Sequence, residues 1–442
     1  MWLTSRREDR QPPEAAPGIG WWSRARHDAG NGAGGEAMKP TVRGSTLSAV
    51  LRSAVLGPQL RSRADIAQDT GLTKPTVSKL VEQLMAAGVL ADGEAVSRGT
   101  GRPSTPLVLP PQGVVGIGVE IASDHLGVRA VDLRGATVDE RRSLVPTLEE
   151  EPGATVDRTV ALLLDVLSGV SGRAVSGVCV SVPGRLSVDR TTVLSAPNLS
   201  WTDVPLLSLL AGHPSLARHP ALHAAPVTPL SVHNDSQLAA EFELSHRGDA
   251  SFMYVFGETG IGGAIVIDGE LYVGTNGWAG EIGHVAVEVG GARCRCGRRG
   301  CLEAHASYDA LRSRADLGPD VPIHEVVDTL ARRLGDRRAV IEMIGVPLGY
   351  ALANTLNVLD LSTVVLGGYF APIAGELEPV LHQVFRERAL AEEHGQVRVG
   401  RAVDDAHPAL SGATRTALDP VLNHTPEWIA AMAHDAGATL RP

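Results

Sequence analysis

The spacing of apolar residues changes along the chain, from a helical period near the N-terminus to short continuous runs beyond residue 111. Between residues 41 and 56, apolar side chains recur every three or four positions, which predicts a helix with one buried face. Further on, short apolar runs alternate with longer helical patterns, and this alternation predicts an α/β body. The predicted strands are Val114–Val119, Val128–Leu133, Val175–Val182, Phe252–Phe256, Gly263–Ile267 and Thr363–Leu366, and the predicted helices include Asp157–Leu167 and Val346–Leu359.

Two short helices joined by a glycine-containing turn are predicted between residues 62 and 88. Ser62 and Asp65 have the spacing of a capping box, in which each side chain bonds a backbone amide that the helix leaves free. Gly71 suits the end of this helix, and Thr73 with Pro75 suits the start of the next one. A helix, a turn and a second helix of these lengths predict a helix-turn-helix.

The second of these helices carries hydroxyl and ammonium groups on its outward side, as a recognition helix in a major groove does. The basic, glycine-rich residues 97–104 predict a two-stranded wing, from which an arginine would enter a minor groove. The alternative is a helical hairpin that serves only for packing. The predicted DNA contacts are Thr73, Lys74, Thr76, Ser78, Lys79 and Arg102.

The charge distribution favours DNA binding over packing alone. The whole chain has a net charge of −10, yet residues 39–110 carry nine Lys and Arg against five Asp and Glu. A basic segment on an acidic body is expected where one part of a protein meets an anionic partner. Solvated faces show the same asymmetry, so the charge supports the motif and does not establish it alone.

The region Ala279–Glu303 combines three of the four cysteines of the chain with a histidine. Cys294, Cys296 and Cys301 lie within eight residues, and His284 precedes them by ten positions. Thiolates and an imidazole are ligands of structural Zn²⁺, which takes four protein ligands. The alternative is three unpaired thiols in a core, but the four arginines among them argue against a core segment. The sequence predicts a zinc ion held by these four side chains.

The same region contains Glu-x-Gly-His followed by Cys-x-Cys-Gly-x-x-Gly-Cys-x-Glu, and it resembles the signature of the ROK family of sugar kinases and sugar-responsive repressors. The resemblance implies a two-lobed actin-like (ribonuclease H-like) fold with a ligand cleft between the lobes. The helix-turn-helix segment also resembles the winged helix at the front of ROK repressors, which the sugar kinases of the family lack.

Six side chains match positions that contact sugar in ROK proteins, and they are of the types that bond several hydroxyls at once. The resemblance implies that His284 binds zinc through one ring nitrogen and a sugar hydroxyl through the other. For the Asn-Asp pair the alternative is a turn or a helix cap, and for the two glutamates it is a solvated carboxylate. The predicted sugar contacts are Asn198, Asn234, Asp235, Glu281, His284 and Glu303.

The phosphate-binding turns of ROK kinases are altered in this chain. The kinases carry Asp-x-Gly-Gly-Thr after the first strand, where this sequence has Glu120-Ile-Ala-Ser-Asp124. Glycine-lined turns hold phosphate through backbone amides, whereas Asp124 would point a carboxylate at a polyanion. In the second turn, Glu258 stands where a kinase usually has glycine. Asp235 matches the catalytic base, but without a nucleotide site its expected role is to bond a sugar hydroxyl.

The predicted domains are a tail over residues 1–39, a winged helix-turn-helix over 40–110, a first lobe over 111–230 and a second lobe with the zinc loop over 231–442, whose final helix can return to the first lobe. Residues 1–37 show no apolar period and are expected to be disordered, and Met38 is a candidate start codon. No apolar run approaches the roughly 18 residues of a membrane helix. Clustered thiols suit a reducing cytoplasm.

Together these features predict a sugar-responsive repressor of carbohydrate metabolism genes, with no enzymatic activity, that binds operator DNA as a homodimer or a dimer of dimers. Cleft closure is expected to move the zinc-loop region and hence the DNA-binding heads. The second hypothesis is a ROK sugar kinase with a fused DNA-binding head. A third is a DNA-binding protein whose body has become an interaction module. Sugar-dependent ADP formation separates the kinase from the other two.

Overall fold

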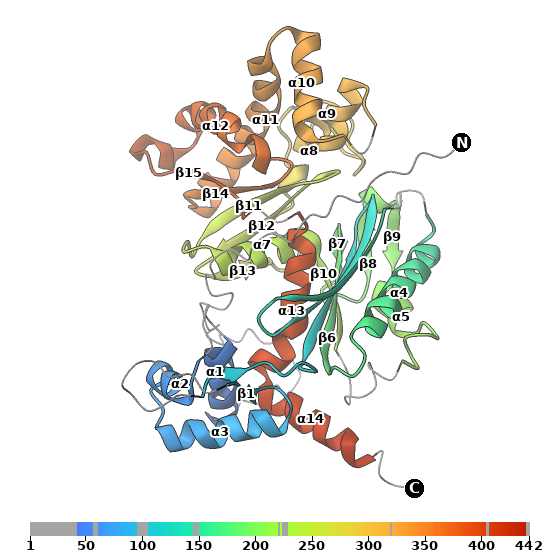
Figure 1. The fold of residues 1–442 in the computed structure, drawn as a ribbon. Coiled ribbons are helices and arrows are strands. Elements are labelled where there is room, and N and C mark those ends of the chain that lie inside the picture. Colours follow the sequence, from blue (N-terminus) through green and yellow to red (C-terminus); the bar gives the residue numbers. More distant parts are fainter. Residues whose placement is uncertain are drawn as a thin grey trace, which may run out of the picture.

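The computed structural model describes residues 42–55, 61–94, 105–144, 150–219, 222, 229–318, 321–403 and 406–438. In this part of the chain, a small N-terminal head lies beside one end of a larger body of two lobes (Figure 1). The predicted tail over residues 1–39, Leu56 and the wing residues 97–104, including Arg102, lie outside the described residues.

The head contains three helices and a two-stranded antiparallel sheet. The predicted capping box is present, because the Ser62 hydroxyl accepts the Asp65 amide and the Ser62 amide donates to the Asp65 carboxylate. Gly71 ends α2 with a φ of 69°, where glycine is favoured, and the Thr73 hydroxyl caps α3. The elements of the head are α1 (Val42–Val55), α2 (Arg63–Thr70), α3 (Lys74–Ala86), β1 (Ala91–Asp92) and β2 (Leu107–Val108).

The two lobes repeat one sheet topology. The first sheet has the strand order β5-β4-β3-β6-β10, and the second has the order β13-β12-β11-β14-β15. In both sheets a meander of three antiparallel strands is followed by two strands that pair in parallel. This repeated topology is that of the actin-like fold, so the predicted α/β fold of the body is confirmed.

The first lobe includes a small side sheet in the order β7-β8-β9 and receives helix α13 (Pro408–Asn423), whereas the helix that follows, α14 (Thr425–Ala438), packs against α1 of the head. The other elements of the first lobe are β3 (Val115–Ile121), β4 (His125–Asp132), β5 (Thr137–Leu144), α4 (Pro152–Gly169), β6 (Val175–Val182), β7 (Arg185–Leu186), β8 (Val193–Ala196), η1 (Pro197–Leu199), β9 (Trp201–Val204), α5 (Leu206–Ala211) and β10 (Leu230–Asn234).

The second lobe carries a helical subdomain on the outer face of its sheet (Figure 1). Its elements, with the helix α7 that leads into it, are α7 (Asp235–His246), β11 (Phe252–Gly257), β12 (Ile261–Ile267), β13 (Glu270–Tyr272), η2 (Ile282–His284), α8 (Leu302–Ala306), α9 (Tyr308–Ala315), α10 (Ile323–Leu334), α11 (Arg337–Leu359), β14 (Thr363–Gly368), η3 (Ala371–Ile373), α12 (Ala374–Arg388), η4 (Leu390–His394) and β15 (Arg398–Arg401).

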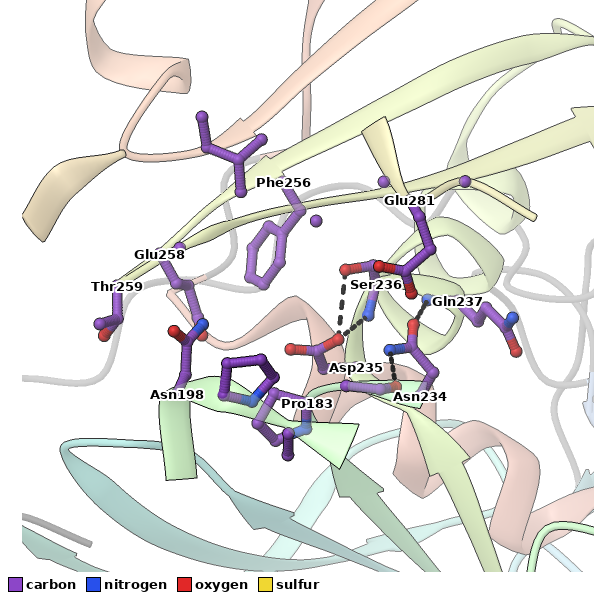
Figure 2. A pocket seen from close by; sticks show the side chains of 18 of the residues that line it. Pro183, Asn198, Asn234, Asp235, Ser236, Gln237, Phe256, Glu258, Thr259 and Glu281 are labelled. Atoms are coloured by element: carbon purple, nitrogen blue, oxygen red, sulfur yellow. Dashed lines mark hydrogen bonds between the residues drawn. The ribbon is translucent and has the colours of Figure 1, made fainter. Parts of the chain in front are cut away.

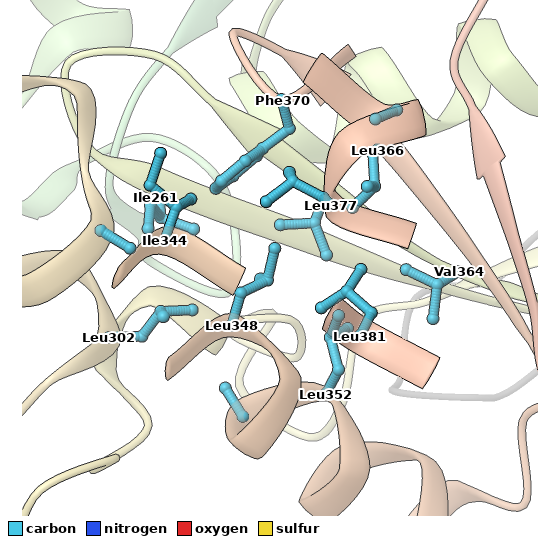
Figure 3. Close-up of a cluster of buried hydrophobic side chains, with 14 of the residues drawn as sticks. Ile261, Leu302, Ile344, Leu348, Leu352, Val364, Leu366, Phe370, Leu377 and Leu381 are labelled. Carbon is cyan, nitrogen blue, oxygen red and sulfur yellow. The ribbon is translucent and has the colours of Figure 1, made fainter. Parts of the chain in front are cut away.

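The core of the second lobe lies between its sheet and the helices α11 and α12. Leu348 and Leu352 of α11 pack toward Val364 and Leu366 of β14 (Figure 3). By length and composition α11 alone, among the described residues, could cross a membrane, but one of its faces is buried in this core. Its apolar composition is therefore explained by its place in the core.

Helices α7 and α13 pack against each other between the two sheets. Helix α13 lies directly on β3 and β6, where a Cβ added at Gly118 would stand 2.7 Å from the Thr414 amide nitrogen. The C-terminal end of α13 enters the apolar core of the head, with Leu418 and Leu422 in the same buried cluster as Leu51. One helix thus joins the first sheet, the space between the lobes and the head.

Several elements differ from the sequence prediction, and strand β5 and helix α11 show two reasons for this. Strand β5 was not predicted, because its sequence TVDERRSL is charged and it forms an edge of the sheet. Helix α11 begins at Arg337, nine residues before the predicted start, and continues through Pro347. The Asp336 side chain accepts the Arg338 amide at 2.8 Å and caps the start of the helix. Ile344 and Leu348, on either side of the proline, are fully buried and hold the helix in the core.

The packing of α13 on β3 predicts that Gly118→Ala is destabilising. The added methyl group would press on backbone atoms of α13, and overpacking of this kind costs about 1–3 kcal/mol. Gly153→Ala in α4 is the control, because no atom lies near its added Cβ and alanine favours a helix. Urea unfolding measures both variants. A Gly118→Ala protein with the midpoint of the parent would show that α13 does not pack this closely.

Candidate functional site

A polar cavity lies between the lobes and takes its lining from both (Figure 2). Its empty volume is about 950 Å³, which includes space open to solvent. The structure brings together at this cavity all of the side chains that were predicted to contact sugar, which are Asn198, Asn234, Asp235, Glu281, His284 and Glu303.

Asn234 and Asp235 lie where strand β10 ends and helix α7 begins. The Asn234 side chain accepts the Gln237 amide at 3.0 Å and donates to the Gly184 carbonyl at 3.0 Å, so it caps the helix. The predicted alternative of a helix cap therefore holds for Asn234, although its amide also lines the cavity. One Asp235 oxygen accepts the backbone amide and the hydroxyl of Ser236, and the other is directed into the cavity (Figure 2).

Carboxylates crowd this side of the cavity, and two of them have a raised pKa. Burial raises the pKa of Asp235 to about 6, and the charge of Glu120 adds to the shift. Burial also raises the pKa of Glu258 well above its usual range, with further contributions from the charges of Glu120 and Asp235. The electrostatic environment at this end therefore disfavours any additional anion.

On the second lobe, Glu303 links the cavity to strand β12. Its Oε2 accepts the Ile261 amide at 3.1 Å, and its Oε1 lies 3.5 Å from the Cys294 sulfur. Gly260 lies between Glu303 and Asn198, because a Cβ there would stand 2.4 Å from the glutamate oxygen and 2.6 Å from the amide nitrogen. Glu303 and Asn198, both predicted to contact sugar, come from different lobes and approach each other at this glycine.

The predicted metal ligands form one cluster beside the cavity. The donor atoms of His284, Cys294, Cys296 and Cys301 all lie within 4.8 Å of one another. His284 Nδ1 is 3.8 Å from the Cys294 sulfur, and the Cys296 and Cys301 sulfurs are 3.8 Å apart. Four thiolates around a tetrahedral Zn²⁺, with bonds of about 2.3 Å, stand roughly 3.8 Å apart. The donor set and its spacing therefore fit a tetrahedral metal ion.

The loop that carries these cysteines requires glycine at its tight turn. Gly300 has a φ of 75°, and a Cβ there would stand 1.7 Å from the Glu288 carbonyl oxygen. The second nitrogen of His284, Nε2, faces the opposite way and lies 3.8 Å from Glu281 Oε2. The imidazole therefore has one nitrogen on the thiol cluster and the other beside a lining carboxylate.

The two turns that correspond to the kinase phosphate sites are bonded to each other. The Ser123 hydroxyl in the first turn lies 2.6 Å from the Thr259 hydroxyl in the second. Asp124 does not point at the cavity as expected; its carboxylate is 2.7 Å from His125 Nδ1. The carboxylates that line the cavity here are Glu120 and Glu258.

Sequence reasoning missed several lining residues. Gln237 fixes the loop of the second lobe, because its Nε2 donates to the Gly277 carbonyl at 3.0 Å. Ser236 bonds the Asp235 carboxylate from the same helix turn. Both residues directly follow the Asn-Asp pair. A helix that begins at the cavity places its first turn there, and this could have predicted them from the sequence. The bond between Ser123 and Thr259 had no such signal, because 136 positions separate them.

The residues predicted to contact DNA lie on or beside α3, except Arg102, which is outside the described residues. Thr73, Lys74, Thr76 and Lys79 are exposed, whereas Ser78 is half-buried. The Thr73 and Thr76 hydroxyls lie 2.8 Å apart and share a hydrogen bond. Within the described ranges, neither lysine has a carboxylate partner, so both ammonium groups face solvent.

The sequence is similar to those of known repressors and sugar kinases. The xylose repressor of Caldicellulosiruptor bescii is 27% identical over 371 residues, covering 78% of this chain and 88% of that protein. A glucokinase of Halalkalibacterium halodurans is 29% identical over 315 residues, covering 66% of this chain and 91% of the glucokinase.

A crystal structure of a ROK family transcriptional regulator, a homologue of the E. coli MLC protein, superposes with a TM-score of 0.66. It covers 88% of this chain and 99% of the regulator at 20% identity, so the likeness is one of fold. The sequence profile of the ROK family matches residues 116–419, which is more than half of the chain. This chain therefore belongs to the ROK family.

Proposed function

We propose that this protein is a sugar-responsive transcriptional repressor that binds operator DNA through its head and a sugar in the cavity between its lobes. The proposal rests on one observation: the two turns that hold phosphate in the kinases are bonded to each other here and lie beside carboxylates. Ser123 and Thr259 bond across the space between the turns, and Glu120 and Glu258 line the cavity beside them. A sugar can enter a cavity lined by carboxylates, amides and an imidazole, but a polyphosphate meets like charge.

The size of the electrostatic effect supports a receptor over a kinase. At an effective dielectric constant of about 20, one carboxylate roughly 4 Å from a phosphate charge opposes binding by about 4 kcal/mol. That energy corresponds to about a thousandfold in affinity. Asp235 still stands where a kinase has its base, and one relative is a glucokinase, so the kinase with a DNA-binding head is kept as the alternative. Two other relatives are named xylose repressors.

The head supports the DNA-binding part of the proposal. Helices α2 and α3, joined at Gly71, and the β1–β2 pair have the order of a winged helix-turn-helix. The exposed hydroxyls and ammonium groups of α3 suit a recognition helix in a major groove. A homodimer, or a dimer of dimers, would present two such helices to half-sites one DNA turn apart, because reading helices in this class work in pairs.

The Cys₃His cluster is proposed to hold structural Zn²⁺. All four positions of a tetrahedral ion are filled by protein donors, which is the arrangement of a structural site. The ion would order the loop from Cys294 to Cys301 and fix the ring of His284. Because the other nitrogen of that ring lies beside Glu281 at the cavity, a sugar and the zinc loop would share one side chain.

Helix α13 connects the wall of the cavity directly to the head. Next to its N-terminus, His407 Nδ1 lies 3.7 Å from Glu120 Oε2. Next to its C-terminal end, Arg52 of α1 donates to the Leu422 carbonyl at 3.1 Å and to the Asn423 side chain at 3.0 Å. We infer that a lobe movement at the cavity reaches the heads through this helix. A sugar that binds one lobe arrangement more tightly would then change the affinity for DNA.

Lys74→Ala is expected to weaken DNA binding without changing sugar binding. Loss of one phosphate contact lowers the salt dependence of binding, so that the slope of log K against log salt falls by about 1. The measurement is fluorescence anisotropy on DNA that the full-length protein selects from a random pool. Arg338→Ala, an exposed arginine of the second lobe paired with Glu342, is the control. Parental affinity and slope in Lys74→Ala would remove α3 as the reading helix.

Asp235→Asn is expected to abolish the release of DNA by sugar and to leave DNA affinity without sugar unchanged. A hydrogen bond from a sugar hydroxyl to a charged acceptor contributes about 1.5–3 kcal/mol. Burial holds the pKa of Asp235 at about 6, so the carboxylate is neutral below that pH and charged above it. The parent protein should therefore respond to less sugar as the pH rises through about 6.

The same anisotropy assay, with sugar titrated across this pH range, measures both effects. Asp157→Asn on the exposed face of α4 is the matched control. Xylose and glucose are the first sugars to test, because the relatives are named for them. A parental sugar response in Asp235→Asn would place the effector elsewhere.

A further inference from the structure

A second group of metal-binding side chains lies outside the Cys₃His cluster. Glu120 comes from β3, His125 begins β4 and His407 immediately precedes α13. Their donor atoms lie within 4.8 Å of one another. His125 Nε2 is 3.0 Å and His407 Nδ1 is 3.7 Å from Glu120 Oε2. Glu120 and His125 are buried and His407 is half-buried, so the three side chains are held by their surroundings.

We propose that Glu120, His125 and His407 form a site for a divalent transition-metal ion such as Zn²⁺. Imidazole nitrogens with one carboxylate are a donor set that zinc and its neighbours prefer. Bonds of about 2.0–2.1 Å at tetrahedral angles place neighbouring donor atoms roughly 3.3 Å apart. The two distances to Glu120 Oε2 lie on either side of this value, so small side-chain rotations suffice to close the site.

Asp124 supplies the supporting contact that such a site needs. Its Oδ1 lies 2.7 Å from His125 Nδ1, so the Nδ1–H group donates to this carboxylate and the Nε2 lone pair faces Glu120. Metal-binding histidines in proteins usually donate their other N–H to a carboxylate, which sets the tautomer and the ring orientation. Asp124 occupies the position of the phosphate-turn threonine of the kinases. Its role here would be to orient the ring of His125 toward the metal ion.

The surrounding charges favour a cation. Glu258 and Asp235 are charge neighbours of Glu120 in the cavity wall, and a divalent ion would offset their mutual repulsion. Arg142 is the opposing charge, with its guanidinium 3.2 Å from His407 Nδ1. Its residue is exposed on the edge strand β5, so its side chain can turn to solvent. The three protein ligands leave one position of a tetrahedral ion for water.

The metal content of the full-length protein tests the site. After dialysis against a chelator and reloading with Zn²⁺, elemental analysis is expected to find two ions per chain in the parent. His125→Ala and His407→Ala should each keep one ion, and Cys296→Ser should lose the loop ion and keep the other. His213→Ala, a histidine of the same lobe paired with Asp157, should keep two.

Two further measurements separate the sites and protect the test from misfolding. Loaded with Co²⁺, the Cys₃His cluster gives thiolate charge-transfer absorption, and that absorption should persist in His407→Ala while the second equivalent is lost. His407 is half-buried beside a loop, so this variant keeps the test open if His125→Ala fails to fold. Asp124→Asn should bind the second ion about 10–100-fold more weakly and leave the loop ion in place.

Two results would overturn the proposal. One is a parent protein that takes up a single zinc ion, held by the cysteines, which would mean that His125 carries a proton between Asp124 and Glu120. The other is a second ion that persists in both histidine variants. Neither result contradicts the proposed repressor function, because Glu120 without an ion keeps the charge that opposes a polyphosphate and the bond between Ser123 and Thr259 needs no ion.

Discussion

The close packing of helix α13 against the glycines of the first sheet is the contact on which the rest of the structure depends. At Gly116 and Gly118 of β3 the sheet has no side chains in the way, so the backbone of α13 approaches to van der Waals distance. On its other side, Gly412 lets α13 approach α7 equally closely, because a Cβ there would stand 2.1 Å from the Leu238 carbonyl oxygen. The two lobes therefore meet through two helices in direct backbone contact.

This packing positions the cavity and the head relative to each other. Residues at the N-terminal ends of both central helices lie at the cavity or beside its wall, since α7 begins at Asp235 in the cavity and His407 precedes α13 beside Glu120. The other end of α13 lies in the core of the head. The proposed function needs such a mechanical connection, because a sugar in the cavity can act on DNA binding only through an element whose arrangement both sites influence.

Local sequence signals predicted much of this molecule, and long-range contacts account for what they missed. The capping box at Ser62 and Asp65, the strand Val175–Val182 and the convergence of the Cys₃His residues depend on short spacings with a direct physical meaning. Strand β5 escaped prediction because an edge strand needs no apolar alternation on its exposed side. Glu120 and His125 are only five positions apart, but His407 lies 287 positions after Glu120, and no local pattern indicates that it joins them.

The central claim is that the cavity binds a sugar as a receptor and not as a kinase. It is tested most directly by the thermal unfolding of the full-length protein with a panel of monosaccharides, amino sugars, sugar phosphates and disaccharides, each with and without MgATP. A ligand that binds only the folded protein raises its midpoint. The account predicts that at least one sugar does so alone and that MgATP adds nothing. Stabilisation by MgATP together with sugar-dependent ADP formation would contradict it.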